Sequence, residues 1–541
     1  MSERVSSTGS ANAYDVIVIG AGANGLAAAT RLAQAGRRVL LLERADALGG
    51  QGAVLEFAPG FRAAPLGIDP GWVPPAVARS LGLESLATDT SDAPLSVAVA
   101  PGSFLTLSRD AGRAAEAIRA HSAKDAAAWP AFTARLHRLA DFLGALYQTP
   151  SPDVGLTSMA DLPALARLAL KYRGLGPRDM IEFLRILPSS VWDLLDDAFE
   201  STPLKGAVAA GGIQDYRQGP RSGGTGYVLL HHLVGAPAGM VRGRLPWAGG
   251  PGAFTAAAEA AARRAGVTIR TGAAVTRIVV RDDAATGVVL ANGEEISAGA
   301  VLSTADATRT LLEWVDPVWL DPEFMHAVAN IRYRGCTAVV LYALEALPSV
   351  PGLASPEALA GLVSLTPSVR ALEKAADAAK FGEISEHPHV EITVPTLRAA
   401  GLADGGKHVL VARVQYAPYA LRDGAAWDAA RRDALADRVS AAIEAVAPGF
   451  GGRVRHRVAL SPRDLEERFG LREGAPSGGE LGLDQILFMR PVAGWGRHAT
   501  PIRGLYLGGV SAHPGPGILG GAGWLAANRL LEDGRGGKGR S

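Results

Sequence analysis

The residues best suited to bind phosphate lie near the N-terminus, in the sequence GAGANG at positions 20–25. The first glycine of such a turn permits a tight bend, the second lets the backbone approach a diphosphate, and the third lets a helix pack closely on a strand. The helix that follows would present free N–H groups and a positive dipole to the phosphates. We therefore expect a dinucleotide diphosphate to be bound by Gly20, Gly22, Ala23, Asn24 and Gly25.

The residues around this turn predict the elements that hold it. Residues 14–19 are β-branched and apolar on both faces, which indicates a buried parallel strand. Residues 26–36 carry apolar side chains at helical spacing, and residues 38–42 predict a second strand that ends at Glu43. A carboxylate at this strand end can accept both hydroxyls of an adenosine ribose and disfavours a 2′-phosphate. The alternative interpretation is a tight glycine turn in an ordinary α/β unit.

A second glycine pair, Gly49 and Gly50, follows Glu43 and Arg44 closely. With this pair the chain resembles the FAD-dependent oxidoreductases that include amine oxidases and phytoene desaturases. The resemblance implies that the pair makes a second backbone approach to the FAD diphosphate, beside Arg44. Members often carry arginine directly after the pair, where Gln51 stands here. The expected fold is α/β, with a Rossmann-type, glutathione-reductase-like FAD-binding domain and an inserted mixed α+β substrate or cap domain.

Two later segments extend the resemblance. Residues 274–280 predict a strand that, in the family, returns the chain to the FAD domain and brings backbone near Val275 to the adenine; a β-meander is the alternative. Near the C-terminus a strand leads into a glycine pair and then into a glycine-rich helix start, whose N–H groups can face the flavin pyrimidine. The flavin contacts implied there are Gly508, Gly509, Pro514, Gly517 and Ile518.

The motif TPIRGLYLGG, followed by HPGPGILG, is similar to the phytoene-desaturase branch, and within it to the pyridine nucleotide-disulfide oxidoreductase domain 2-like subgroup. A redox dithiol is excluded because Cys336 is the only cysteine. The expected FAD-binding domain is discontinuous and comprises 1–75, 240–330 and 480–541. The expected substrate or cap domain comprises 76–239 and 331–479.

Candidates for chemistry beyond the cofactor are few. His513 lies beside the flavin-facing helix start, so we expect a catalytic role; the alternative is that its ring fixes the turn by a hydrogen bond. His231, next to another histidine, is a candidate proton shuttle at the substrate, with a structural role as the alternative. Tyr416 is a candidate for the substrate cavity or an ordinary strand residue. The pair His387 and His389 lacks a third ligand, so no metal site is expected.

Composition excludes several classes of protein. The 541 residues are 48% hydrophobic and 20% charged with a net charge of +1, which predicts a globular chain and no nucleic-acid partner. One cysteine and no long apolar segment favour a cytoplasmic location. Amphipathic helices at 162–172 and 180–187 leave peripheral contact with a membrane open beside packing in the cap domain, and a homo-oligomer also stays open.

These features predict an FAD-dependent dehydrogenase or desaturase in which flavin N5 takes a hydride from a small hydrophobic substrate of polyene or isoprenoid type. A second strand–GxGxxG–helix unit for a nicotinamide cofactor is lacking, so the electron acceptor stays open: oxygen, a quinone or another carrier. Two alternatives stay open. One is a flavin-dependent double-bond isomerase or saturase, and the other is an FAD-containing binding or regulatory protein without catalysis.

Overall fold

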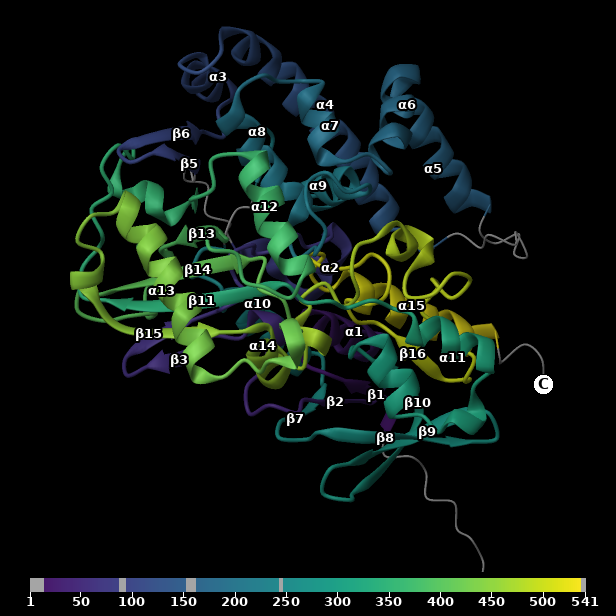
Figure 1. The fold of residues 1–541 in the computed structure, drawn as a ribbon. Helices are drawn as coiled ribbons and strands as arrows, with labels where there is room; N and C mark the ends of the chain where they lie inside the picture. The colour runs from purple at the N-terminus through teal and green to yellow at the C-terminus, as the bar shows by residue number, and fades with distance from the viewer. Residues whose placement is uncertain (1–13, 87–93, 152–161, 243–246, 537–541) are drawn as a thin grey trace, which may run out of the picture.

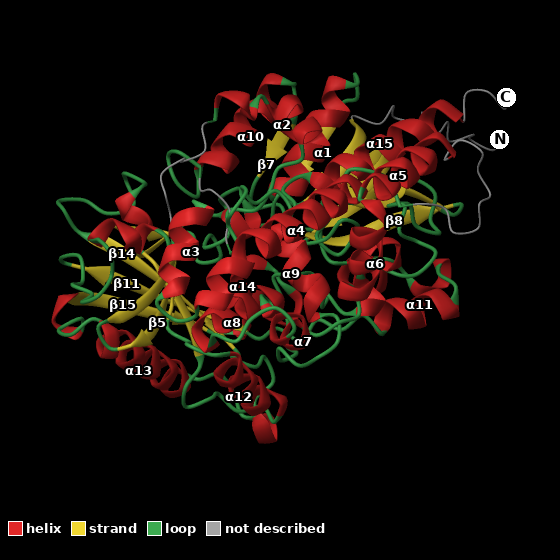
Figure 2. Cartoon of the chain, turned by 90° about the horizontal axis from the view of Figure 1, so that it is seen from above, coloured by secondary structure: helices red, strands yellow, loops and turns green. Residues whose placement is uncertain are grey.

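The structure, a computed structural model, describes residues 14–86, 94–151, 162–242 and 247–536. Two seven-stranded sheets organise the chain. In Figure 2 strands β11, β14 and β15 lie on one side of the molecule and β7 and β8 on the other, with helices between them. The segments of the first sheet come from both ends and the middle of the sequence, as the colours of Figure 1 show.

The first sheet is built on parallel strands in the order β7-β2-β1-β10, with β16 also parallel to β10. The strands β8 and β9 continue it in antiparallel fashion beside β10. Its strands are β1 (Tyr14–Ile19), β2 (Val39–Leu42), β7 (Thr268–Arg270), β8 (Val275–Arg281), β9 (Ala284–Leu290), β10 (Glu295–Ser303) and β16 (Leu505–Leu507). The strands β1 and β2 are adjacent and parallel, and one helix connects them in the sequence. This βαβ arrangement confirms the predicted α/β class and Rossmann-type unit.

Helices cover the parallel centre of this sheet on the face where β1 presents Val16 and Val18. They are α1 (Ala23–Gln34), α2 (Pro75–Leu81), α10 (Ala253–Arg264) and α15 (Gly521–Gly536). The side chains of Val77 and Leu81 on α2 share this core, so α2 packs with the first sheet, although the expected domain division placed it in the cap. The opposite face packs against α11 (Pro322–Ala329) and the residues that precede it.

The second sheet has the order β15-β11-β14-β13-β12-β5-β6 and is antiparallel except where β12 meets β5. Its strands are β5 (Leu95–Ala100), β6 (Ser103–Leu107), β11 (Thr337–Leu344), β12 (Leu362–Ser364), β13 (His389–Thr393), β14 (His408–Gln415) and β15 (Val454–Leu460). All eight residues of β11 are buried, because one face of the sheet packs on α13 (Ala429–Val446) and the other on the hairpin β3 (Leu55–Ala58)–β4 (Phe61–Ala63) and α14 (Pro462–Phe469).

Further helices join the two sheets around a third core that includes Trp129 and Tyr147. They are α3 (Ala111–Arg119), α4 (Ala123–Tyr147), α6 (Gly176–Ile186), α7 (Val191–Asp196), α8 (Thr202–Ala209), α9 (Thr225–Leu233) and α12 (Val369–Lys380). Helix α5 (Leu162–Gly174) pairs with α6 at the edge of the molecule (Figure 1). Among the described residues we find no helix with the length and apolar character needed to cross a membrane.

Candidate functional site

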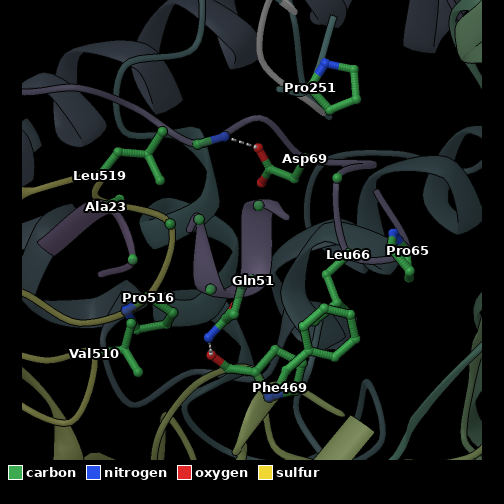
Figure 3. Close-up of a pocket in the computed structure, with 18 of the residues that line it drawn as sticks. Ala23, Gln51, Pro65, Leu66, Asp69, Pro251, Phe469, Val510, Pro516 and Leu519 are labelled. Carbon is green, nitrogen blue, oxygen red and sulfur yellow. Dashed lines mark hydrogen bonds between the residues drawn. The ribbon is translucent and has the colours of Figure 1, made fainter. Parts of the chain in front are cut away.

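One cavity of about 630 Å³ connects the glycine turn after β1 with the second sheet. Its wall on the first-sheet side includes the glycine turn and the end of β2, and its opposite wall includes residues of β11, β13 and β14. Figure 3 shows part of this cavity, with Ala23 and Gln51 near Pro516 and with Leu66 and Asp69 on another side. A dinucleotide bound at the turn would therefore reach into a chamber shared by both sheets.

The two glycine segments form a cradle of bare backbone. Gly22 pairs with Gly49 in a parallel bridge, and the Gly49 N–H donates to the Ala21 carbonyl at 3.0 Å. A Cβ on Gly50 would lie only 3.3 Å from the Cα of Gly22, and all three glycines line the cavity. The first N–H groups of α1 have no partner within the helix. This cradle fits a diphosphate, as expected for a dinucleotide.

The other glycines of the turn have packing roles. A Cβ on Gly25 would stand 1.8 Å from the carbonyl oxygen of Gly20, so only glycine permits this approach of α1 to the turn. Gly25 is accordingly absent from the cavity lining, while Gly20, Ala23 and Asn24 belong to it. The close helix–strand packing expected from the third glycine is thus visible in the geometry.

Glu43 directly follows β2 at the cavity wall and is only 8% exposed. Its Oε2 accepts from the Ala21 N–H at 2.8 Å and its Oε1 from the Ala45 N–H at 3.0 Å. These bonds fix the carboxylate, and each oxygen keeps acceptor capacity for a ribose hydroxyl. Arg44 also lines the cavity, but it donates to the carbonyls of Glu467 and Arg468, both at 3.0 Å. Burial lowers the pKa of Arg44.

The remaining expected flavin contacts divide into two groups. Val275, Gly517 and Ile518 line the cavity. Gly508, Gly509 and Pro514 are outside its lining; a Cβ on Gly509 would stand 2.3 Å from a carbonyl oxygen of the loop after β10. Those two glycines therefore serve a close approach of chain segments. The residue after the second glycine pair also has a structural contact, because Gln51 donates from Nε2 to the Pro476 carbonyl at 2.9 Å (Figure 3).

His513 does not line the cavity. It is buried, and its Nε2 lies 3.2 Å from the Thr149 carbonyl at the end of α4, a contact in which the ring N–H donates. Burial lowers the pKa of His513 to about 4, so the ring is neutral at pH 7. The contact corresponds to the alternative in which the ring fixes the turn. The expected catalytic role gains no support from this placement.

His231 and Tyr416 are also fully buried outside the cavity lining. The Nδ1 atom of His231 lies 2.6 Å from the Tyr147 hydroxyl, and its Nε2 lies 2.8 Å from the Pro516 carbonyl. The Tyr416 hydroxyl donates to the Gln218 carbonyl at 3.0 Å. These contacts hold chain segments together, so the expected contacts with substrate gain no support, and the structural alternatives fit both residues.

The sequence reasoning missed a polar wall of the cavity. Its members are Asp69, Gln214, Asp215, His232, Arg242, Thr337, Arg398 and Arg413. His232 Nδ1 lies 3.8 Å from Asp69 Oδ2, and Gln214 Nε2 donates to the same oxygen at 3.4 Å. Arg413 pairs with Asp215 at 2.9 Å. Only His232, beside the suspected His231, had a signal in the sequence, because the other members come from separate segments.

Apolar side chains form much of the remaining chamber beyond the glycine cradle. They include Leu66, Ile68, Leu95, Met240, Trp247, Phe254, Val339 and Leu362. Lysine is absent from the described residues that line the cavity. The chamber can therefore hold an apolar body next to a group that meets the polar wall.

Three comparisons relate this chain to known proteins. Residues 24–349 match the family of flavin-containing amine oxidoreductases. The chain is 32% identical to pyridine nucleotide-disulfide oxidoreductase domain-containing protein 2 of Rattus norvegicus, across 96% of this chain and 94% of that protein. It is 25% identical to a subunit of the limonene dehydrogenase of Castellaniella defragrans, with the same coverages of 96% and 94%. The structure of cyclohexylamine oxidase from Brevibacterium oxydans matches with a TM-score of 0.55 at 16% identity, over 96% of this chain and 99% of that chain.

Proposed function

The chain belongs to the flavin-containing amine oxidoreductases, and from that premise we propose that it is a dehydrogenase or desaturase for a substrate with a hydrophobic body. At the coarser level it is an FAD-dependent oxidoreductase of the amine oxidase and desaturase type, with FAD as its cofactor. The name of one relative, a limonene dehydrogenase, supports a dehydrogenase acting on an isoprenoid-like compound.

The single observation that carries this proposal is the continuity of the cavity. The cradle of Gly22, Gly49 and Gly50 opens into a chamber with an apolar lining that includes Leu66 and Phe254. FAD, when bound, supplies a hydride acceptor at its N5. The chain positions the diphosphate with bare backbone at the cradle, and Glu43 provides acceptors at the ribose end. The surrounding apolar side chains would exclude water from a substrate in the chamber.

The proposed electron acceptor is oxygen or a quinone. The GxGxxG turn at 20–25 is the strand–turn–helix unit that supplies the dinucleotide cradle, and the described residues of the cavity join it to the chamber beside the second sheet. A soluble or membrane-borne oxidant would then take the electrons after the oxidised product has left.

The test is anaerobic mixing of the FAD-loaded protein with terpenes, polyenes, fatty acids and amines, followed by absorbance at the flavin band. A dehydrogenase or desaturase bleaches the flavin and yields a product with two fewer hydrogens. An isomerase or saturase gives a product of equal or greater hydrogen content. A flavin that no compound reduces, in a protein that retains a partner on affinity capture, would favour the non-catalytic alternative.

The proposal includes a cytoplasmic protein that touches an anionic membrane surface through α5 and α6. Leu170 and Ile181 on these helices are 68% and 69% exposed, and Leu184 is 59% exposed. Four exposed basic residues accompany them: Arg167, Lys171, Arg173 and Arg178. Apolar side chains next to cations suit the boundary between acyl chains and anionic headgroups, where an apolar substrate would also be found.

A further inference from the structure

Arg242 stands out on the polar wall because it lines the cavity although its side chain is buried. The side chain is 3% exposed. Its Nη2 forms an ion pair with Glu391 Oε1 at 2.6 Å, but neither that oxygen nor Arg242 Nη1 has a hydrogen-bond partner among the residues that the structure describes. Buried guanidinium N–H groups are normally paired, because the loss of water must be compensated by an acceptor. An acceptor for this nitrogen is therefore expected from a molecule that enters the cavity.

The charge of Glu391 holds the Arg242 side chain in place but provides no hydrogen-bond acceptor for its Nη1. Glu391 lies outside the cavity lining and also contacts His389, whose Nε2 is 3.4 Å from Glu391 Oε1. Burial alone would raise the pKa of Glu391, but the charge of Arg242 and the contact with His389 hold it well below its usual value. Glu391 is thus an anion that anchors one nitrogen of Arg242 and leaves the other for a ligand.

The rest of the wall favours an anionic group over a cationic one. Arg398 and Arg413 border the same cavity as Arg242 and come from different segments of the chain. The two acids on this wall already have partners: Asp215 pairs with Arg413, and Asp69 accepts from the Gly71 N–H at 3.0 Å and from Gln214. A carboxylate offers the two coplanar oxygens that a guanidinium binds best. An ammonium group carries only donors, so it could not accept a hydrogen bond from Arg242 Nη1.

We propose that the substrate is an amphiphile with a carboxylate at one end, which Arg242 binds while the apolar body lies along the apolar lining of the chamber. This deepens the proposed function and rests on it, since it takes the chamber as the substrate site. Arg242 thereby selects acids over neutral hydrocarbons, and the charged end fixes which carbons of the apolar body face the cofactor.

The experiment measures binding without turnover. Titration calorimetry on the FAD-loaded protein compares straight-chain carboxylates of four to twelve carbons with their primary amides, which keep the shape and lose the charge. For the best chain length we expect the acid to bind about 10- to 100-fold more tightly than the amide. In Arg242→Met this ratio should fall close to one while FAD content stays at the wild-type level.

Two further variants separate charge recognition from folding. Arg242→Met/Glu391→Met removes both charges of the buried pair, so it should fold even if the single variant does not, and it should also lose the preference for acids. Arg455→Met removes an exposed arginine that pairs with Glu345 at 2.7 Å, and it should keep the preference.

Several results would overturn the proposal. They are equal binding of acids and amides by the wild-type protein, no binding of any acid in the series, an unchanged preference in the Arg242 variants, or loss of FAD from those variants. Flavin bleaching is recorded separately with the same compounds. Acids that bind through Arg242 without bleaching would leave this proposal standing and count against the proposed dehydrogenase, so the two failures are distinguishable.

Discussion

Replacing His513 by glutamine should remove part of the sensitivity of the fold to acid. Burial lowers the pKa of His513 from 6.5 to about 4 in the folded protein. Between these values the unfolded chain binds a proton at this site and the folded chain does not, so folding stability falls as the pH falls. Well above pH 6.5 the ring is neutral in both the folded and the unfolded state, so this loss of stability is absent there. Linkage over these two pKa values gives a loss of about 2 kcal/mol between pH 7.5 and pH 5.

Urea unfolding of the FAD-loaded protein, followed by tryptophan fluorescence at pH 7.5 and pH 5, measures this loss. Glutamine can donate from Nε2 to the Thr149 carbonyl, as the neutral ring does. The wild-type protein should therefore lose about 2 kcal/mol more than His513→Gln between the two pH values. His498 is present in both proteins, and burial lowers its pKa to about 3, so its contribution cancels in the comparison. Equal pH dependence of the two proteins would refute the reasoning.

Three more predictions follow from the glycine turn and the exposed helices. Gly22→Val should purify as a folded protein, because a Cβ there meets Gly50 at an ordinary 3.8 Å, but its FAD affinity should be lower by at least about tenfold because the larger side chain fills the cradle. The FAD content of the purified protein measures this, with Gly174→Val as the control. Full FAD content in Gly22→Val would contradict the prediction. Gly25→Ala should instead reduce the yield of soluble protein severely, because its Cβ would stand 1.8 Å from a carbonyl oxygen, and normal yield and thermal stability would count against that packing role. Leu170→Glu should lower flotation with phosphatidylglycerol vesicles several-fold, whereas Phe381→Glu, which alters a side chain that is 71% exposed on another surface, should not, and equal effects would exclude α5 as the contact.

The cofactor end of the cavity was predictable because its chemistry is local in the sequence. Gly20, Gly22 and Gly25 lie within six positions, and only one helix and one short strand separate them from Glu43. Their roles depend on backbone conformation and close approach, which residue type and spacing determine directly. Val275 and Gly517 lie far from this turn in the sequence. Both line the cavity, and the resemblance supplied the long-range pairing that spacing alone does not give.

The histidines show where such reasoning fails. A histidine next to a glycine-rich helix start has the same sequence pattern whether its ring points into a cavity or into the protein. The orientation of His513 depends on the Thr149 carbonyl, which lies just after α4 and 364 positions earlier in the chain. His231 and His232 are neighbours on one helix, and neighbouring positions face different directions. The sequence therefore could not decide which of the two borders the cavity.

The sequence could not predict the polar wall either, because its residues come from separate segments of the chain. Arg242, Arg398 and Arg413 are separated by segments that belong to different strands and loops, and arginine accounts for most of the basic residues of the chain. Only burial distinguishes the guanidinium of Arg242 from the many exposed ones. Burial of this guanidinium lowers the stability of the folded protein, and its unpaired nitrogen lowers it further. Because backbone N–H groups and Glu43 already account for the cofactor end of the cavity, recognition of the substrate is the use that best explains the burial of Arg242.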